Sequence, residues 1–202
     1  MDPSGGWRLV SALEEGKLLL EGGGMRVIGM KGLMPWPLEV VREIRRLALA
    51  SSARSCSVVG AHIGEPLVAL AGRCPRIAAA YEPDPAKCYL MEETLELNEL
   101  KVPVRCEWVS SGESRRSIYL DGAETTVEVV GVNRVVNGRV DLVMFLCEEC
   151  ASAASGLDCS ALSLSRGYVF PRSSGLGRRL IDCGFSVRRS AREALALSPS
   201  YV

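Results

Sequence analysis

Hydrophobic and polar residues alternate along the chain with two different periods. Residues 7–30 contain short apolar runs separated by glycines, the pattern of short strands joined by tight turns. From Leu38 to Ala48, apolar residues recur at helical spacing and arginines occupy the opposite face. The first segment therefore predicts an N-terminal hairpin or meander, and the second predicts an amphipathic helix.

Strands and helices are predicted to alternate after this helix. Short apolar runs that suit buried strands are followed by segments of helical character, and Pro85 suits the first turn of a helix. Two successive β-α-β units predict a parallel sheet with helices on both of its faces. The predicted strands span 56–59, 76–81 and 102–109, and the helices between them span 64–73 and the segment that starts at Pro85.

The second half of the chain has a less regular pattern, with a turn signal at Asn137-Gly138. Its predicted strands span 117–132, 133–140, 140–147 (a central strand), 161–170 and 185–188, and its helices span 151–156 and 173–183. We expect an α/β fold with a Rossmann-like, mostly parallel sheet whose last strand is antiparallel. Residues 34–202 would form this domain, and residues 1–33 a small N-terminal β extension.

Composition and charge narrow the class of protein. The 202 residues are 48% apolar, enough for a proper core, and 24 basic residues balance 24 acidic ones. This balance gives no electrostatic argument for a nucleic-acid partner, although a local patch stays open. Without a signal-like start or an apolar run of roughly 20 residues, we expect a cytoplasmic protein that does not enter membranes. The lack of glutamine and the 20 arginines against four lysines suit a thermophile or a GC-rich genome.

Cysteine is abundant, and its pattern leaves two alternatives open. The eight cysteines are Cys56, Cys74, Cys88, Cys106, Cys147, Cys150, Cys159 and Cys183. Buried thiols are the favoured interpretation, and one or two disulfides are the other. The Cys147-x-x-Cys150 pair invites a zinc interpretation, but a closed zinc site needs four ligands, and the chain has no second such pair and a single histidine. We therefore predict no metal site.

A glycine turn with an acid downstream is the strongest chemical signal. Gly60 and Gly64 lie where the first strand of the alternating region passes into a helix, so the backbone can approach a ligand there. Glu82 follows the next strand, within Tyr-Glu-Pro-Asp-Pro. An acid at that place can accept hydrogen bonds from the two hydroxyls of a ribose. Together the turn and the acid predict a cofactor site.

These motifs resemble the class I S-adenosylmethionine-dependent methyltransferases. Val-Gly-Ala-His-Ile-Gly-Glu followed by Tyr-Glu-Pro-Asp-Pro is most similar to the FkbM family, whose members read roughly D-V-G-A-N-x-G and F-E-P-x-P, and the match covers about residues 55–110. The resemblance implies S-adenosylmethionine as the cofactor. It implies that Gly60, Ala61 and Gly64 pack on the methionine part, that Glu82 holds the ribose, that Ser110 and Ser111 lie near the adenine, and that His62, Glu65 and Pro83 complete the contacts.

Three departures from the family pattern bear on catalysis. The family's acid two positions before the first glycine is Val58, and its usual asparagine is His62. The lysine and aspartate of the family's K-I-D-V-E-G are Met144 and Leu146, and only Glu148 keeps its place. Glu148 or its neighbour Glu149 is then the best candidate base, and the alternative is that both are solvated loop acids.

The sequence supports several functions. The first is methylation of a hydroxyl on a small molecule or sugar; the second is a methyltransferase-fold protein without catalysis that serves as a binding or scaffold subunit. The third is an RNA methyltransferase similar to the tRNA guanine-N1 enzymes, and a homodimer is possible in each case. For His62, a pocket residue contacting the cofactor by backbone and ring is favoured over a catalytic base or a metal ligand.

Overall fold

The computed structural model describes residues 5–112, 115–120, 123–137, 140–190 and 192–198. A seven-stranded sheet forms the centre of the molecule, in the order β12-β13-β11-β10-β4-β5-β6. Its strands are β4 (Ser55–Val59), β5 (Arg76–Tyr81), β6 (Val104–Arg105), β10 (Leu142–Phe145), β11 (Gly167–Pro171), β12 (Ser186–Arg189) and β13 (Glu193–Leu197). β13 runs antiparallel to both of its neighbours, whereas the pairs from β11 to β6 are parallel. The expected mostly parallel sheet with an antiparallel last strand is confirmed.

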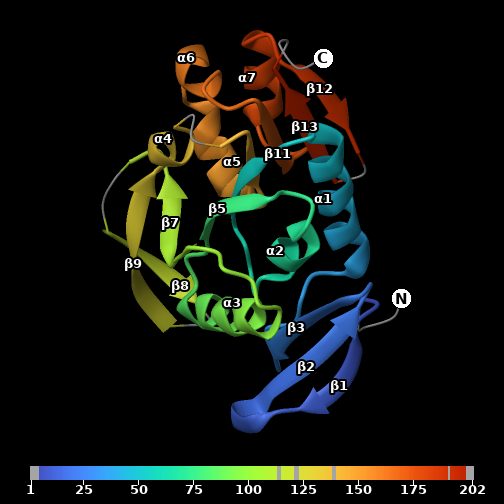
Figure 1. Cartoon of the computed structure of the whole chain (residues 1–202). Helices are drawn as coiled ribbons and strands as arrows, with labels where there is room; N and C mark the ends of the chain where they lie inside the picture. The colour runs from blue at the N-terminus through green and yellow to red at the C-terminus, as the bar shows by residue number, and fades with distance from the viewer. Residues whose placement is uncertain (1–4, 113–114, 121–122, 138–139, 191, 199–202) are drawn as a thin grey trace.

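Helices cover both faces of this sheet, and alternate strand residues point to the two layers (Figure 1). One layer holds α1 (Leu38–Ser51), α2 (Glu65–Leu70) and α3 (Pro85–Leu97). The other holds α4 (Val132–Val135), α5 (Glu148–Ser155), α6 (Cys159–Leu162) and α7 (Leu176–Asp182). On β10, for example, Met144 faces the first layer and Phe145 the second. The central strand is therefore apolar on both sides, as its sequence predicts.

The N-terminal segment folds as the expected meander. β1 (Arg8–Ala12), a short 3-10 turn (Glu14–Gly16), β2 (Lys17–Gly22) and β3 (Met25–Met30) form an antiparallel sheet at the bottom of Figure 1. Trp7 and Val27 share a buried cluster with Val41 of α1, and Ile28 packs with Ile63. The small sheet is thereby fixed against the helices that begin at the carboxyl edge of the central sheet.

A third sheet takes the place of the helix that would join β6 to β10. It contains β7 (Glu107–Ser110), β8 (Arg115–Leu120) and β9 (Ala123–Gly131), with β7 parallel and β8 antiparallel to β9. It lies at the left of Figure 1. Val109 and Val130 belong to the hydrophobic cluster that also contains α4 and α5. The chain thus returns to the amino edge of the central sheet through strands instead of a long helix.

Several elements predicted after α3 differ from the structure. The third strand, expected at 102–109, ends at Arg105, and the chain then joins the third sheet. Residues 133–140, expected as a strand, begin with the one-turn helix α4, because Val132 and Val135 both bury their side chains in the second layer. The strand expected at 161–170 starts only at Gly167, and β13 was not predicted at all. Gly138 of the predicted turn lies outside the described residues.

Six cysteines form disulfides, so the expectation of buried thiols holds only for Cys56 and Cys74. The three pairs are Cys88–Cys106, Cys147–Cys150 and Cys159–Cys183. In the described part of the chain, no group of three or more metal-ligating side chains comes together. No described helix combines the length and hydrophobicity needed to cross a membrane.

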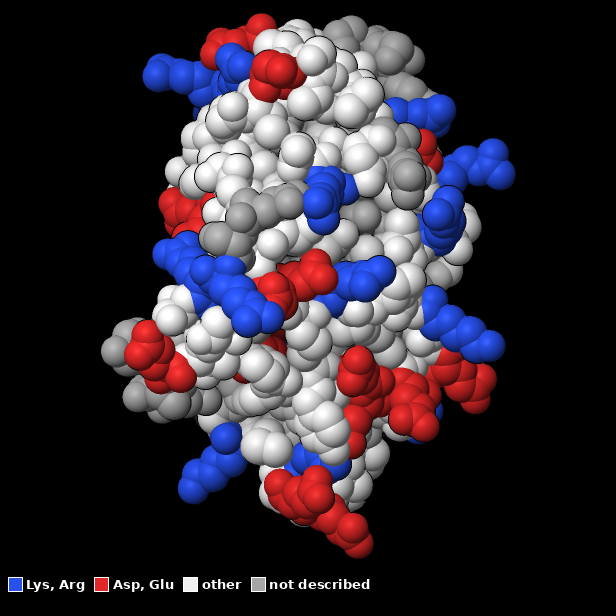
Figure 2. Space-filling model, turned by 90° about the vertical axis from the view of Figure 1, so that its left-hand side faces the viewer, with Lys and Arg blue, Asp and Glu red and all other residues white. Residues whose placement is uncertain are grey.

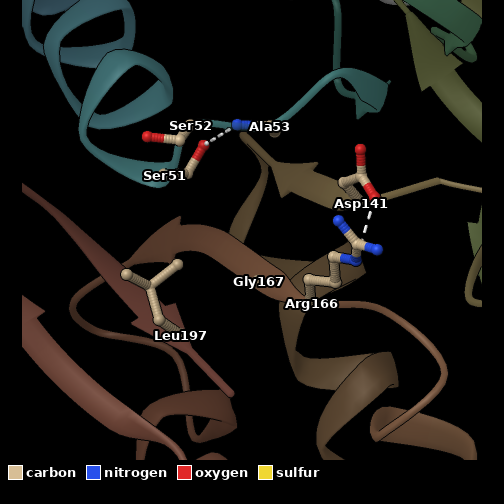
Figure 3. Close-up of a pocket in the computed structure, with 7 residues that line it drawn as sticks. All are labelled: Ser51, Ser52, Ala53, Asp141, Arg166, Gly167 and Leu197. Carbon is tan, nitrogen blue, oxygen red and sulfur yellow. Dashed lines mark hydrogen bonds and ion pairs between the residues drawn. The ribbon is translucent and has the colours of Figure 1, made fainter. Parts of the chain in front are cut away.

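At the amino edge of the central sheet, the carboxylate of Asp141 contacts the segments that begin three strands (Figure 3). Asp141 accepts hydrogen bonds from the backbone N–H groups of Arg54 and Ser55 at 3.0 and 3.1 Å, and its other oxygen lies 3.2 Å from Nε of Arg166. The adjoining cavity, lined also by Leu197, measures about 10 Å³, which is room for about one water molecule. Asp141 therefore joins the starts of β4, β10 and β11.

Candidate functional site

The glycine turn lies at the opposite, carboxyl edge of the sheet, directly after β4. The N–H groups of Gly60 and Ala61 both donate to the carbonyl of Tyr81, which ends β5, at 2.8 and 3.0 Å. Gly60 has φ +78°, and a Cβ there would stand 3.3 Å from Cβ of Cys147. Gly64 has φ +96°, and a Cβ there would stand 3.2 Å from Thr94. The two glycines thus let the turn pack against the end of β10 and against α3.

Glu82 joins the turn to the end of β5. Its Oε2 accepts the N–H of His62 at 2.9 Å, and its Oε1 accepts the N–H of Asp84 at 3.3 Å. The carboxyl group is buried, and burial raises its pKa above the usual value, partly opposed by the hydrogen bond from His62. Each of its oxygens can accept a further hydrogen bond. Hydroxyl donors at this place would therefore stabilise the charged form.

The segment that follows Glu82 is held by its own backbone contacts. Asp84 caps α3 by accepting from the N–H groups of Ala86 and Lys87, and Pro83 lies between the two acids. The sulfur of Cys88 lies 3.1 Å from the carbonyl oxygen of Glu82 and forms a disulfide with Cys106, the residue after β6. The acid is thereby fixed from both sides.

His62 and Glu65 form a close pair inside the turn. His62 is a non-glycine residue with φ 55°, and its Nδ1 lies 2.7 Å from Oε1 of Glu65. Glu65 is fully buried, and its Oε2 has no hydrogen-bond partner among the described residues. The predicted residues Gly60, Ala61, Gly64, His62, Glu65, Glu82 and Pro83 therefore come together in one place.

Two tryptophans complete this pair, and neither was predicted. The backbone N–H of Trp36 donates to Oε1 of Glu65 at 2.9 Å. The ring of Trp36 stacks on the imidazole of His62 with centroids 5.2 Å apart. The indole N–H of Trp7 donates to the carbonyl of Trp36 at 2.7 Å. The one signal in the sequence is that Trp36 stands between two prolines just before α1, where a chain is stiff.

The end of β10 supplies the predicted base candidates. Met144 and Leu146 are buried in the core, so the positions of the family's lysine and aspartate serve packing here. Glu148 and Glu149 lie in the first turn of α5 and are exposed, next to the Cys147–Cys150 disulfide. The contact between Gly60 and Cys147 brings this turn to the edge where the glycine turn lies.

The position of Val58 explains why no acid stands beneath the turn. Val58 is fully buried and pairs in register with Met144 of β10, within the cluster formed by α1, α2 and α3. A carboxylate at this place would lose its hydration without gaining a charged partner on the neighbouring strand. The turn is instead held by the backbone hydrogen bonds to Tyr81 and by Glu82.

Ser110 and Ser111 do not follow a strand of the central sheet. They were expected near the adenine because they would follow the third strand, but that strand ends at Arg105. Ser110 ends β7 and lies opposite Gly131, the residue before α4. Their role in cofactor binding stays a prediction, without the positional reason that suggested it.

Comparison with known proteins identifies the fold. No model of a protein family matches the chain, and no curated protein matches it. Solved structures do: magnesium protoporphyrin IX methyltransferase from Synechocystis PCC 6803 with bound S-adenosylmethionine has a TM-score of 0.52 and 13% identity over 79% of this chain and 78% of that chain. TYW2 from M. jannaschii, in complex with the same cofactor, has a TM-score of 0.52 and 14% identity over 92% and 86%.

A third solved structure extends the range of acceptors among these similar proteins. The Pyrococcus abyssi tRNA (uracil-54, C5)-methyltransferase has a TM-score of 0.54 and 9% identity over 92% of this chain and 44% of that chain. At such identities the likeness concerns the fold alone. The chain therefore has the fold of the class I S-adenosylmethionine-dependent methyltransferases. The resemblance to the FkbM family rests on the sequence motifs only.

Proposed function

We propose that this protein binds S-adenosylmethionine at the carboxyl edge of its sheet and transfers the methyl group to a hydroxyl of a small molecule or sugar. The observation that carries the proposal is Glu82. It is a buried carboxylate at the end of β5, it holds the N–H of His62 in the glycine turn, and it retains acceptor capacity. A ribose with two adjacent hydroxyls supplies the donors that such a group lacks.

The residues fit the cofactor at some points and not at others. Glu82 and the turn between Gly60 and Gly64 offer a ribose acceptor and a close backbone approach. The glycines also serve the protein itself, because Cys147 and Thr94 occupy the space that their side chains would need. The cofactor, when bound, supplies a sulfonium methyl group. The chain contributes positioning, which supplies much of the rate of an in-line transfer.

A second candidate function is supported by a specific observation. Both oxygens of Glu82 already accept backbone N–H groups, and Val58 replaces an acid with a buried apolar side chain. The carboxyl edge could then be stable without a ligand. This arrangement supports a binding or scaffold subunit that has kept the fold and lost the transfer reaction.

An RNA acceptor receives less support. Figure 2 shows the face that carries the third sheet, and on it Lys and Arg side chains are interspersed with Asp and Glu. Trp108 of β7 stacks with Arg116, but Arg115 of the same sheet pairs with Glu128. A nucleic-acid surface is expected to carry a continuous field of positive charge instead.

Calorimetry with S-adenosylhomocysteine and S-adenosylmethionine tests the proposal. We expect binding in the micromolar range by the native chain and a loss of at least about tenfold in Glu82→Ala, since the buried acceptor and its hold on the turn both disappear. Glu92→Ala, which removes an exposed carboxylate from α3, serves as the matched control and should bind normally.

The outcomes separate the candidate functions. No heat with millimolar ligand would overturn the cofactor site and with it the enzyme. Binding that Glu82→Ala abolishes, together with methyl transfer to no hydroxyl compound in a panel of sugars and phenols, would favour the scaffold. Transfer to a hydroxyl acceptor would establish the enzyme.

A further inference from the structure

The pair formed by His62 and Glu65 has the geometry of an oriented acid–base dyad. Nδ1 of His62 lies 2.7 Å from Oε1 of Glu65, a charge-assisted hydrogen-bond distance. The carboxylate is fully buried, whereas 13% of the imidazole side chain is exposed, so solvent or a ligand reaches the ring and not the acid. A buried carboxylate that holds Nδ1–H leaves Nε2 as the nitrogen that can take a proton.

The surroundings hold the ring in one orientation. Trp36 stacks on one face of the imidazole at an interplanar angle of 17°. Its backbone N–H donates to Oε1 of Glu65, the same oxygen that Nδ1 of His62 contacts. The backbone N–H of His62 is held by Glu82, so the main chain and the side chain of this residue are both fixed. Such a constraint at a left-handed φ has a cost for a non-glycine residue, and the contacts of the ring offset it.

We propose that His62 is the general base of the methyl transfer and that Glu65 is its positioning residue. This inference rests on the proposed function and deepens it, because it assigns a residue that accepts the proton and thereby names the acceptor as a hydroxyl compound. In the reaction, the hydroxyl oxygen bonds to the methyl carbon and the carbon–sulfur bond breaks with its electron pair left on sulfur. The hydroxyl proton goes to Nε2 of His62 and then to solvent.

The charges around the ring suit this role. The two carboxylates of Glu65 and Glu82 lie beside His62, so a positive charge formed on the imidazole would be attracted by two nearby negative charges. Oε2 of Glu65 has no described hydrogen-bond partner, so no donor balances the negative charge on that oxygen while the ring is neutral. Glu148 and Glu149 lack these features: both are exposed, and neither side chain has a described hydrogen-bond partner.

The single histidine makes a direct test possible. In a sample labelled with 15N in histidine, every imidazole signal belongs to His62. Long-range proton–nitrogen correlation spectra show which ring nitrogen carries the proton. We expect the neutral ring to carry its proton on Nδ1. We also expect His62→Asn, which tolerates the left-handed backbone, to lose methyl transfer to the hydroxyl acceptor by about a hundredfold or more, the usual contribution of a general base.

Variants test the positioning role of Glu65. In Glu65→Gln the negative charge is gone, so methyl transfer should fall and the preference for a proton on Nδ1 of His62 should weaken. Glu92→Gln is the matched control and should change neither. If Glu65→Gln does not fold, the native protein still decides the matter, because a proton on Nε2 in the neutral ring would overturn the dyad.

Two failures can be told apart. Unchanged methyl transfer in His62→Asn, with both ligands bound by calorimetry, would overturn His62 as the base and leave the proposed function intact. If neither ligand binds, the proposed function fails and the base assignment fails with it.

Discussion

The acids at the two edges of the central sheet differ in their hydrogen-bond partners. At the amino edge, Asp141 accepts two backbone N–H groups and also faces the guanidinium of Arg166. At the carboxyl edge, Glu82 accepts two backbone N–H groups and forms no salt bridge with a described residue, and Glu65 leaves one oxygen without a described partner. Both oxygens of Asp141 thus face protein donors, whereas Glu65 at the carboxyl edge keeps one oxygen without a described partner.

This difference separates a structural acid from a candidate functional one. A carboxylate that only stabilises a fold gains most when every oxygen has a partner, because each unmet acceptor in the interior costs free energy. A carboxylate that receives a ligand must keep capacity for it. Unmet acceptors are thus a physical reason to look for function at the carboxyl edge, which is also where ligands bind in open α/β sheets.

Removing Asp141 should give the largest effect on stability. Asp141→Ala leaves the N–H groups of Arg54 and Ser55 without their acceptor, so we expect the free energy of unfolding to fall by about 3 kcal/mol. Urea denaturation followed by circular dichroism measures it. Asp141→Asn keeps one acceptor and should lose roughly half as much. Affinity for S-adenosylhomocysteine should not change in either variant, and a weaker affinity would break the contrast between the edges.

Glu193 tests whether an unmet acceptor by itself indicates a ligand site. It begins β13 at the carboxyl edge, and one of its oxygens also has no described partner. Burial, together with the nearby carboxylate of Glu43, raises the pKa of Glu193 from 4.5 to about 7. Its folded-state pKa lies above the unfolded value, so its favourable contribution is complete below pH 4.5 and is lost as the pH rises through about 7.

Glu193→Gln should therefore stabilise the protein at pH 8 by on the order of 2 kcal/mol and have little effect at pH 4. Thermal or urea unfolding at the two pH values measures the difference, with the exposed Glu39→Gln as the control. The variant should bind S-adenosylhomocysteine as the native chain does. Weaker binding would show that the reserve of acceptors extends along the whole edge.

Alkylation of the cysteines sharpens the comparison without any substitution. Cys159–Cys183 ties α6 to the end of α7, whereas Cys147–Cys150 lies beside the glycine turn. Iodoacetamide added to the unfolded, unreduced chain should modify only the two unpaired thiols, Cys56 and Cys74. Intact mass should show two additions before reduction and eight after it. More than two before reduction would mean that a disulfide is missing.

Much of the first half of the fold could be predicted from the sequence. β5 spans the residues expected, Arg76–Tyr81, and α3 begins at Pro85, because local periodicity and a fixed φ determine both. The glycine turn and Glu82 were placed together for the same reason. Each of these features depends on residues that are close along the chain.

The rest depends on contacts between distant residues. The strand after α3 stops at Arg105, since Cys106 pairs with Cys88 and the following residues pair with β9. The short helix α4 was mistaken for a strand because valine favours strands, and only the core shows that Val132 and Val135 are buried on one side of a helical turn. Trp36 could not be foreseen at the site, since it reaches His62 across 26 residues of sequence, from position 36 to position 62.

The stack of Trp36 on His62 links the N-terminal sheet to the candidate site. By sequence, a boundary near residue 33 divides an appendage from a domain. In the structure, Trp7 holds Trp36, and Trp36 holds the imidazole, so a change in the first strands is transmitted to the turn. The two parts are therefore expected to have diverged together in evolution, and a shortened chain that begins at residue 34 should lose its histidine geometry before it loses its sheet.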